Sequence, residues 1–242
     1  MQIVGLAVLG FVIWYGFGER TDTTITAFDG HAFVMVLGGS LAAVMVSSTA
    51  TTTLRTFLCL RELLPGLGAL SRETRDLEVE RTQLSELWLA GKRSQAVELA
   101  ERSRYPSIRR MLELVLIRAP EEGTRTAFTE LRHAEISRWQ PAVSNWELLA
   151  KLAPSFGMVG TITGMIQLFK SMGEDEMNLG ASISLALLAT LYGVAFGAGV
   201  AGPIGHFLRG LLDEQLGALE RCEQSVGELI ARSGRTAAGP QS

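Results

Sequence analysis

Four long windows of this 242-residue chain contain no charged side chain and are predominantly apolar. They are Met1–Gly18, His31–Leu54, Leu152–Phe169 and Met177–Leu208. A helix rises about 1.5 Å per residue, so the third window spans roughly 27 Å, close to the ~30 Å hydrocarbon thickness of a bilayer. The pattern predicts an all-α, polytopic membrane protein with four transmembrane helices.

The segment between the second and third windows has a different pattern, because apolar residues recur there every three or four positions among Glu and Arg. This spacing is typical of amphipathic helices in a soluble bundle. Gly91, the Tyr105-Pro106 pair and Pro120 interrupt it. We therefore expect a helical domain of two or three short helices, followed by a longer helix that leads into the third span.

These patterns divide the chain into four predicted segments. Residues 1–54 form an N-terminal transmembrane hairpin, 55–146 a cytoplasmic helical domain and 147–208 a second transmembrane hairpin. Residues 209–242 form a cytoplasmic helix that ends at about Arg232, followed by a disordered tail from Ser233. The fourth window has 32 residues, roughly 48 Å of helix, so we expect either protruding ends or a bend at Gly202-Pro203.

Small residues recur at helical spacing on one face of the third window and on one face of the fourth. Such faces let a second helix approach closely. The residues predicted to serve helix packing are Gly157, Gly160, Gly164, Ala189, Gly193 and Gly197.

The distribution of charge predicts which side of the membrane each segment faces. The net charge of −3 is too small to favour nucleic-acid binding. Basic residues gather in the 55–151 block and at Arg209, whereas the two short connections at 19–29 and 174–176 are poor in them. By the positive-inside rule, the 55–151 block and both termini are cytoplasmic. Met1–Gly18 has no basic residue before its apolar run, so we interpret it as a span and not as a signal peptide.

The usual signatures of enzymes are missing from the sequence. It contains no phosphate-binding glycine-lysine loop, no dinucleotide fingerprint and no Cys/His metal spacing, and its three His residues are scattered. Thr161 and Thr190 are isolated hydroxyls in predicted membrane helices. They serve either helix packing, by bonding a carbonyl of their own helix, or a narrow pathway for water or an ion. We expect no catalytic activity, no metal site and no cofactor.

Three motifs resemble one family. They are Ala153–Thr161 followed by Gly164, Leu187–Gly193 followed by Pro203, and Leu37–Ser40 in the second window. The chain resembles the MotA/TolQ/ExbB group of ion-driven motor proteins. Because it has an additional N-terminal helix, it is most similar to the MotA branch of flagellar stator subunits.

The resemblance implies a homopentamer in the bacterial inner (cytoplasmic) membrane, around two copies of a MotB-like single-span protein. The membrane Asp of that partner accepts the ion, and this chain has no carboxylate in its third and fourth spans. The resemblance also implies that Thr161 and Thr190 line the ion pathway of a pore-forming second hairpin. Pro154 and Pro203 would couple ion passage to movement of the cytoplasmic domain, although each proline could instead only shape a helix end.

Two positions differ from patterns within that family. Sodium-driven relatives often have Thr-Thr where this chain has Ala189-Thr190, so H+ is favoured over Na+ as the transported ion. Flagellar members carry an Arg and, eight residues later, a Glu around a Gly, whereas the bases here follow Gly91. The candidate contacts with the rotor protein FliG are Lys92, Arg93, Glu98 and Glu101, and a solvated helix face explains these charges equally well.

Our hypothesis is therefore an ion-conducting stator subunit of a membrane rotary motor. A TolQ/ExbB-like energiser or a non-flagellar motor would use the same pore with another output. A passive oligomeric membrane scaffold, in which the small residues serve assembly alone, is the alternative from a different functional class.

Overall fold

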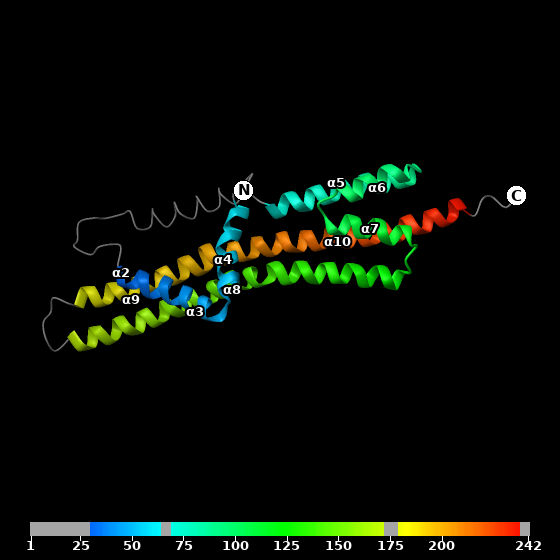
Figure 1. The fold of residues 1–242 in the computed structure, drawn as a ribbon. Helices are drawn as coiled ribbons and strands as arrows, with labels where there is room; N and C mark the ends of the chain where they lie inside the picture. Colours follow the sequence, from blue (N-terminus) through cyan, green and yellow to red (C-terminus); the bar gives the residue numbers. More distant parts are fainter. Residues whose placement is uncertain (1–29, 64–68, 172–178, 238–242) are drawn as a thin grey trace. The chain divides into compact units, whose positions relative to one another are not determined.

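The computed structural model describes residues 30–63, 69–171 and 179–237, which form helices joined by short turns (Figure 1). Within these ranges there is no β-strand, in agreement with the predicted all-α fold. The chain divides into two compact units. Unit 1 comprises Met1–Leu67 and Pro141–Arg209, and unit 2 comprises Gly68–Gln140 and Gly210–Ser242. The predicted first span and both short outward connections lie outside the described residues.

Unit 1 begins with a continuous helix made of α2 (Gly30–Phe33), the π-helical turn η1 (Val34–Gly38) and α3 (Gly39–Ser47). Ser48 is extended and ends this helix. The helix α4 (Ala50–Leu58) and the 3-10 helix η2 (Cys59–Leu63) follow. The C-terminal part of α8 (Glu121–Ser171), all of α9 (Leu179–Phe196), the π-helical turn η4 (Gly197–Ala201) and the start of α10 (Gly202–Ala237) complete unit 1.

Three helical stretches among the described residues are long and apolar enough to cross a membrane. They lie in Gly30–Ser47, Glu121–Lys170 and Ser182–Ser233. The second of these stretches contains the predicted third span, and the first and last overlap most of the predicted second and fourth spans. The count of four spans and the four predicted segments stay predictions.

The irregularity in the fourth predicted span precedes Gly202-Pro203, where the sequence predicted a bend. It is the wide turn η4, at whose end the Gly202 amide donates to the carbonyl of Gly197, five residues earlier. A proline has no amide hydrogen, and its ring crowds the carbonyl four residues before it. A wider turn relieves that crowding, so η4 accommodates Pro203 without ending the helix.

Unit 2 contains α5 (Ala69–Leu89), α6 (Arg93–Arg102), α7 (Pro106–Leu116) and the remaining parts of α8 and α10 (Figure 1). The structure thus confirms the predicted order of shorter helices before a long one. Gly91 ends α5 with φ at +76°, and the Lys92 amide donates to the Leu87 carbonyl at 3.0 Å. This geometry is a Schellman cap, which needs the left-handed conformation that Gly adopts without strain.

The core of unit 2 is built from side chains of all of its helices, with α6 contributing Ala96 and Ala100. Leu84, Ile108, Met111 and Phe128 are fully buried. The helix α10 continues to Ala237, beyond the end predicted at about Arg232. One reason lies in the tertiary structure, because the Trp88 indole nitrogen donates to the Ser233 hydroxyl at 3.0 Å.

Candidate functional site

Glycines bring the backbones of α8 and α9 into direct contact in unit 1. A Cβ atom added to Gly157 would lie 2.9 Å from the Ala189 carbonyl oxygen, and one added to Gly164 would lie 2.8 Å from the Ser182 carbonyl oxygen. A Cβ on Gly160 would collide with the Ala189 methyl group. Larger side chains at these positions would separate the two helices, so the small residues set their distance.

Thr161 and Thr190 face one another across this contact. Their hydroxyl groups are hydrogen-bonded to each other. The Thr161 hydroxyl is also within reach of the Ala186 carbonyl at 3.1 Å and of the Gly157 carbonyl at 3.1 Å, and the Thr190 hydroxyl reaches the Ala186 carbonyl at 3.3 Å. Each hydroxyl has one proton and several acceptors, so the donor direction can reverse without movement of a heavy atom.

The hydroxyl pair borders an apolar surface. Thr190 is exposed and Thr161 half-buried. The large exposed side chains on the same two helices include Met158, Ile162, Met165, Leu187, Leu191 and Val194. Hydroxyls can hydrogen-bond water or a hydrated ion but do not accept a proton as a base near neutral pH. Their carbonyl contacts fit the packing interpretation as well as the pathway interpretation.

The two predicted coupling prolines have different surroundings. Pro154 lies inside α8, and a Cβ added to Gly197 would lie 2.7 Å from Pro154 Cδ. Pro203 lies in the first turn of α10 and is exposed. Pro154 therefore lies against the turn η4 at Gly197, and it also lies close to Gly193 of α9.

The four charged residues proposed to contact a rotor are all exposed at the turn between α5 and α6 or on α6. The Arg93 guanidinium lies over the Trp88 ring, 5.4 Å from its centroid, and Glu98 pairs with Arg102 at 3.0 Å. Lys92 and Glu101 share this exposed region. The arrangement is compatible both with a docking surface and with a solvated helix face.

A buried polar network in unit 1 was missed by the sequence analysis. The Asn145 amide nitrogen donates to the Thr56 hydroxyl at 2.8 Å, and its amide oxygen accepts from the Ser48 hydroxyl at 2.7 Å. The Trp146 indole donates to the Thr56 carbonyl at 2.9 Å. The network fastens α4 to α8. An isolated Asn in a charged helical segment carries no signal for it, because its partners lie about ninety positions away.

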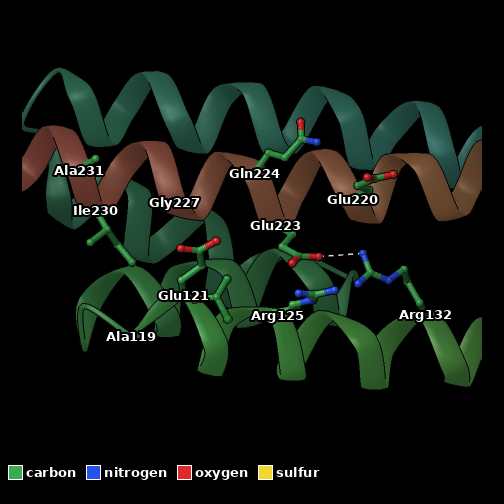
Figure 2. A pocket seen from close by; sticks show the side chains of 11 residues that line it. Ala119, Glu121, Arg125, Arg132, Glu220, Glu223, Gln224, Gly227, Ile230 and Ala231 are labelled. Atoms are coloured by element: carbon green, nitrogen blue, oxygen red, sulfur yellow. Dashed lines mark hydrogen bonds and ion pairs between the residues drawn. The ribbon is translucent and has the colours of Figure 1, made fainter.

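A separate cavity of about 610 Å3 lies between α8 and α10 in unit 2 (Figure 2). The Arg132 guanidinium pairs with the Glu223 carboxylate at 2.7 Å along its wall. None of the predicted site residues lines it. Its charges have both signs, so the cavity does not select a particular ligand by charge.

The two cysteines are unsuited to chemistry near neutral pH. Burial raises the pKa of the Cys222 thiol to about 12 and that of the Cys59 thiol to about 11. Both thiols therefore stay protonated, and a thiol that stays protonated is a poor nucleophile and a poor metal ligand. Among the described residues, no three His, Cys, Asp or Glu side chains are grouped so that they could hold a metal ion.

Comparisons with known proteins identify a family and a shared fold. A model of the MotA/TolQ/ExbB proton channel family matches residues 100–221. Motility protein A from Aquifex aeolicus is 38% identical over 74 residues, which is 31% of this chain and 29% of that relative. The chain thus aligns with less than a third of that relative's length.

Two solved structures share the fold. C. jejuni MotAB superposes with a TM-score of 0.75 at 16% identity, covering 95% of this chain and 88% of the other. The flagellar MotAB stator complex from Bacillus subtilis superposes with a TM-score of 0.75 at 20% identity, covering 94% and 88%. At these identities the likeness establishes a common fold.

Proposed function

Because this chain belongs to the MotA/TolQ/ExbB proton channel family, we propose that it is an ion-conducting stator subunit of a membrane rotary motor. It acts with four transmembrane helices in the bacterial inner membrane, with both termini cytoplasmic. Five copies surround two copies of a MotB-like single-span partner that supplies the membrane Asp. The names of its relatives and the fold shared with MotAB stators support this proposal.

The observation that carries the proposal is the Thr161–Thr190 hydroxyl pair at the contact of α8 and α9. Neither the third nor the fourth predicted span has a carboxylate, so an ion path between them needs its titrating group from another chain. A hydroxyl pair whose donors can reverse is suited to order water toward such a group. Protons therefore pass along the interface between this chain and the partner helix.

The energy released is adequate for a change in helix packing. One elementary charge that crosses 100 mV releases about 2.3 kcal/mol. That amount shifts a two-state equilibrium roughly fiftyfold, since every 1.4 kcal/mol corresponds to a factor of ten. Pro154 and Pro203 transmit the change in packing to the cytoplasmic segment, because a proline weakens the helix around it.

The transported ion is H+ in this proposal. Ala189 offers no side-chain oxygen beside Thr190, and a dehydrated Na+ needs several oxygen ligands. Flux measured with H+ or Na+ as the only permeant cation in proteoliposomes decides between them. A flux that needs Na+ would overturn this choice and leave the stator proposal intact.

The Thr190→Val variant tests the pathway. It keeps the shape of the side chain but removes the hydroxyl, so the complex with the partner should assemble while proton flux falls about tenfold or more. Thr163→Val is the matched control, because the Thr163 hydroxyl bonds only the Val159 carbonyl of its own helix, at 2.9 Å. It should keep its flux. Unchanged flux in Thr190→Val would refute the assigned role.

The output of the motor is a separate question. The matched family also includes TolQ and ExbB, so an energiser with the same pore is the second candidate. Co-purification of the rotor protein FliG, reduced by charge reversal at Lys92 and Glu98, would favour the flagellar stator. A passive scaffold predicts instead that neutralising the membrane Asp of the partner changes nothing.

A further inference from the structure

Two adjacent large apolar side chains are exposed in unit 2. Leu116 ends α7 and Ile117 follows it, and they are 53% and 72% exposed. Ile117 is the most exposed large apolar side chain among the described residues of unit 2. Single exposed apolar side chains are common on proteins, whereas contiguous ones mark a surface that another molecule covers. Leu116, Ile117 and Arg118 are here named the knob.

The backbone holds the knob in one conformation. The Ala119 amide donates to the Leu114 carbonyl at 2.9 Å, and the Arg118 amide donates to the Val115 carbonyl at 3.3 Å. These bonds form a helix cap in which Arg118 has φ at +50°, and within the described ranges no other residue except glycine has a positive φ. Glycine adopts this conformation without strain, and arginine does not. Strain retained at an exposed arginine points to a function for its side chain.

The cavity between α8 and α10 has an apolar end. Figure 2 shows Glu121 beside this end, and the Arg132–Glu223 pair farther along the cavity. The apolar end is lined by Ala119, Ile230 and Ala231. With a volume of about 610 Å3, the cavity has room for two aliphatic side chains. Its charges have both signs overall, but the charged group beside the apolar end is a carboxylate.

The knob does not enter the cavity of its own chain, since Ile117 is 72% exposed. It nevertheless lies at the same end of unit 2 as the cavity, because Ile117 is two residues from Ala119 in the cavity wall. In a ring of identical copies, each copy touches its two neighbours through two different surfaces, and these lie at the same height along the ring axis. The knob and the cavity meet both conditions.

We propose that the knob of one copy inserts into the cavity between α8 and α10 of the next copy in the ring. Leu116 and Ile117 lie against the apolar end, and the Arg118 guanidinium pairs with the Glu121 carboxylate of the next copy. Within the described part of a single chain, neither Arg118 nor Glu121 takes part in an ion pair. The inference rests on the proposed assembly of five copies and assigns one contact within it.

Disulfide cross-linking between copies tests the contact. Full-length Ile117→Cys and Ala231→Cys chains are expressed together with the single-span partner, and oxidation of the purified complex should join the two chains into a dimer. Leu116 and Arg118 remain to hold the contact. Either chain without the other should give no dimer, because the contact joins two different surfaces. The native Cys59 and Cys222 are buried and stay out of the reaction.

A Val79→Cys chain expressed with the Ala231→Cys chain is the matched control. Val79 is 49% exposed on α5 and belongs to neither surface. Because a disulfide forms only between cysteines whose Cα atoms approach within about 7 Å, this pair should give roughly tenfold less dimer.

Arg118→Gly separates the contact from the stability of the chain. Glycine relieves the strained φ, so unfolding should need a higher denaturant concentration. The same change removes the guanidinium, so its introduction into the Ile117→Cys chain should lower the yield of dimer with the Ala231→Cys chain about fivefold. A residue with a structural role alone would change the stability and leave the cross-link as it was.

A complex of parental mass with no more dimer than the control would overturn the contact and leave the proposed stator intact. An unchanged yield in Arg118→Gly would also overturn it. If no dimer forms and Arg118→Gly lowers co-purification of FliG, the knob faces the rotor and the proposal is wrong. Proton flux is measured on the same complexes: loss of flux in the parent would overturn the proposed function, whereas the cross-link reports on the contact between copies alone.

Discussion

Unit 1 and unit 2 differ in the side chains that make their closest helix contacts. In unit 2, Leu84, Met111 and Phe128 are fully buried and form the core. In unit 1 the closest helix contacts are made by glycines, while Ile162 is 61% and Leu187 68% exposed. The two units therefore obtain their packing from different sources.

The difference follows from the solvent that each unit is suited to. In water, burial of large apolar side chains is the main driving force of folding. In a bilayer, exposed Ile and Leu cost nothing because lipid tails are equally apolar, and close backbone contact remains as the source of attraction. The comparison teaches that an isolated exposed apolar side chain needs no explanation in unit 2, whereas the many exposed apolar side chains of unit 1 mark a lipid or partner surface.

The largest expected effect comes from the core of unit 2. Phe128→Ala should lower the free energy of unfolding by about 3–5 kcal/mol, because it removes a fully buried ring and leaves a cavity. Val79→Ala, at a position on α5 that is 49% exposed, is the control and should change little. Denaturant unfolding of the purified chain in detergent measures both. Equal effects in the two variants would show that unit 2 is not stabilised by its core.

A smaller effect is expected at the glycine contact of unit 1. Gly193→Ala should destabilise the chain by about 1–3 kcal/mol through overpacking, although Ala is the better helix former. The new Cβ would lie 2.6 Å from the Ala153 carbonyl oxygen. Gly180→Ala has open space and should be neutral or slightly stabilising. Thermal unfolding in detergent and partner co-purification give the readout. If both variants behaved alike, close backbone contact would not be what holds unit 1 together.

The smallest effect concerns pH. Burial raises the pKa of Cys222 from 9.0 to about 12, so above pH 9 the unfolded chain ionises this thiol while the folded chain keeps it neutral. Ionisation thus favours unfolding, so stability should fall progressively as the pH rises from 9 toward 12, with no contribution from this thiol below pH 9.

Melting temperatures recorded from pH 8 to pH 10.5 measure this slope. Cys222→Ala removes the thiol, so part of the alkaline loss of stability should disappear in that variant. A slope identical to that of the parent would show that the Cys222 site does not discriminate against the thiolate.

Much of the fold was predictable because the relevant patterns are local. The apolar windows, the amphipathic spacing and the breaks at Gly91 and Pro106 follow from hydrophobicity and backbone conformation within a few residues. The predicted end of α10 lies too early in the chain. The hydrogen bond from the Trp88 indole to the Ser233 hydroxyl joins residues 145 positions apart, so no local pattern indicates it. Thr161 and Thr190 were identified as isolated hydroxyls, but their hydrogen bond depends on the register between α8 and α9.

The sequence by itself determined the helical class, the apolar stretches, the small-residue faces and the absence of a membrane carboxylate from the third and fourth predicted spans. Each of these depends on composition or on a period of three to four residues. Only the tertiary structure decided that Pro154 lies against Gly197 instead of marking an isolated kink, and that Asn145 fastens α4 to α8. The reason is physical: helical periodicity specifies the face on which a residue lies, whereas the facing residue is set by how two helices slide and rotate into contact.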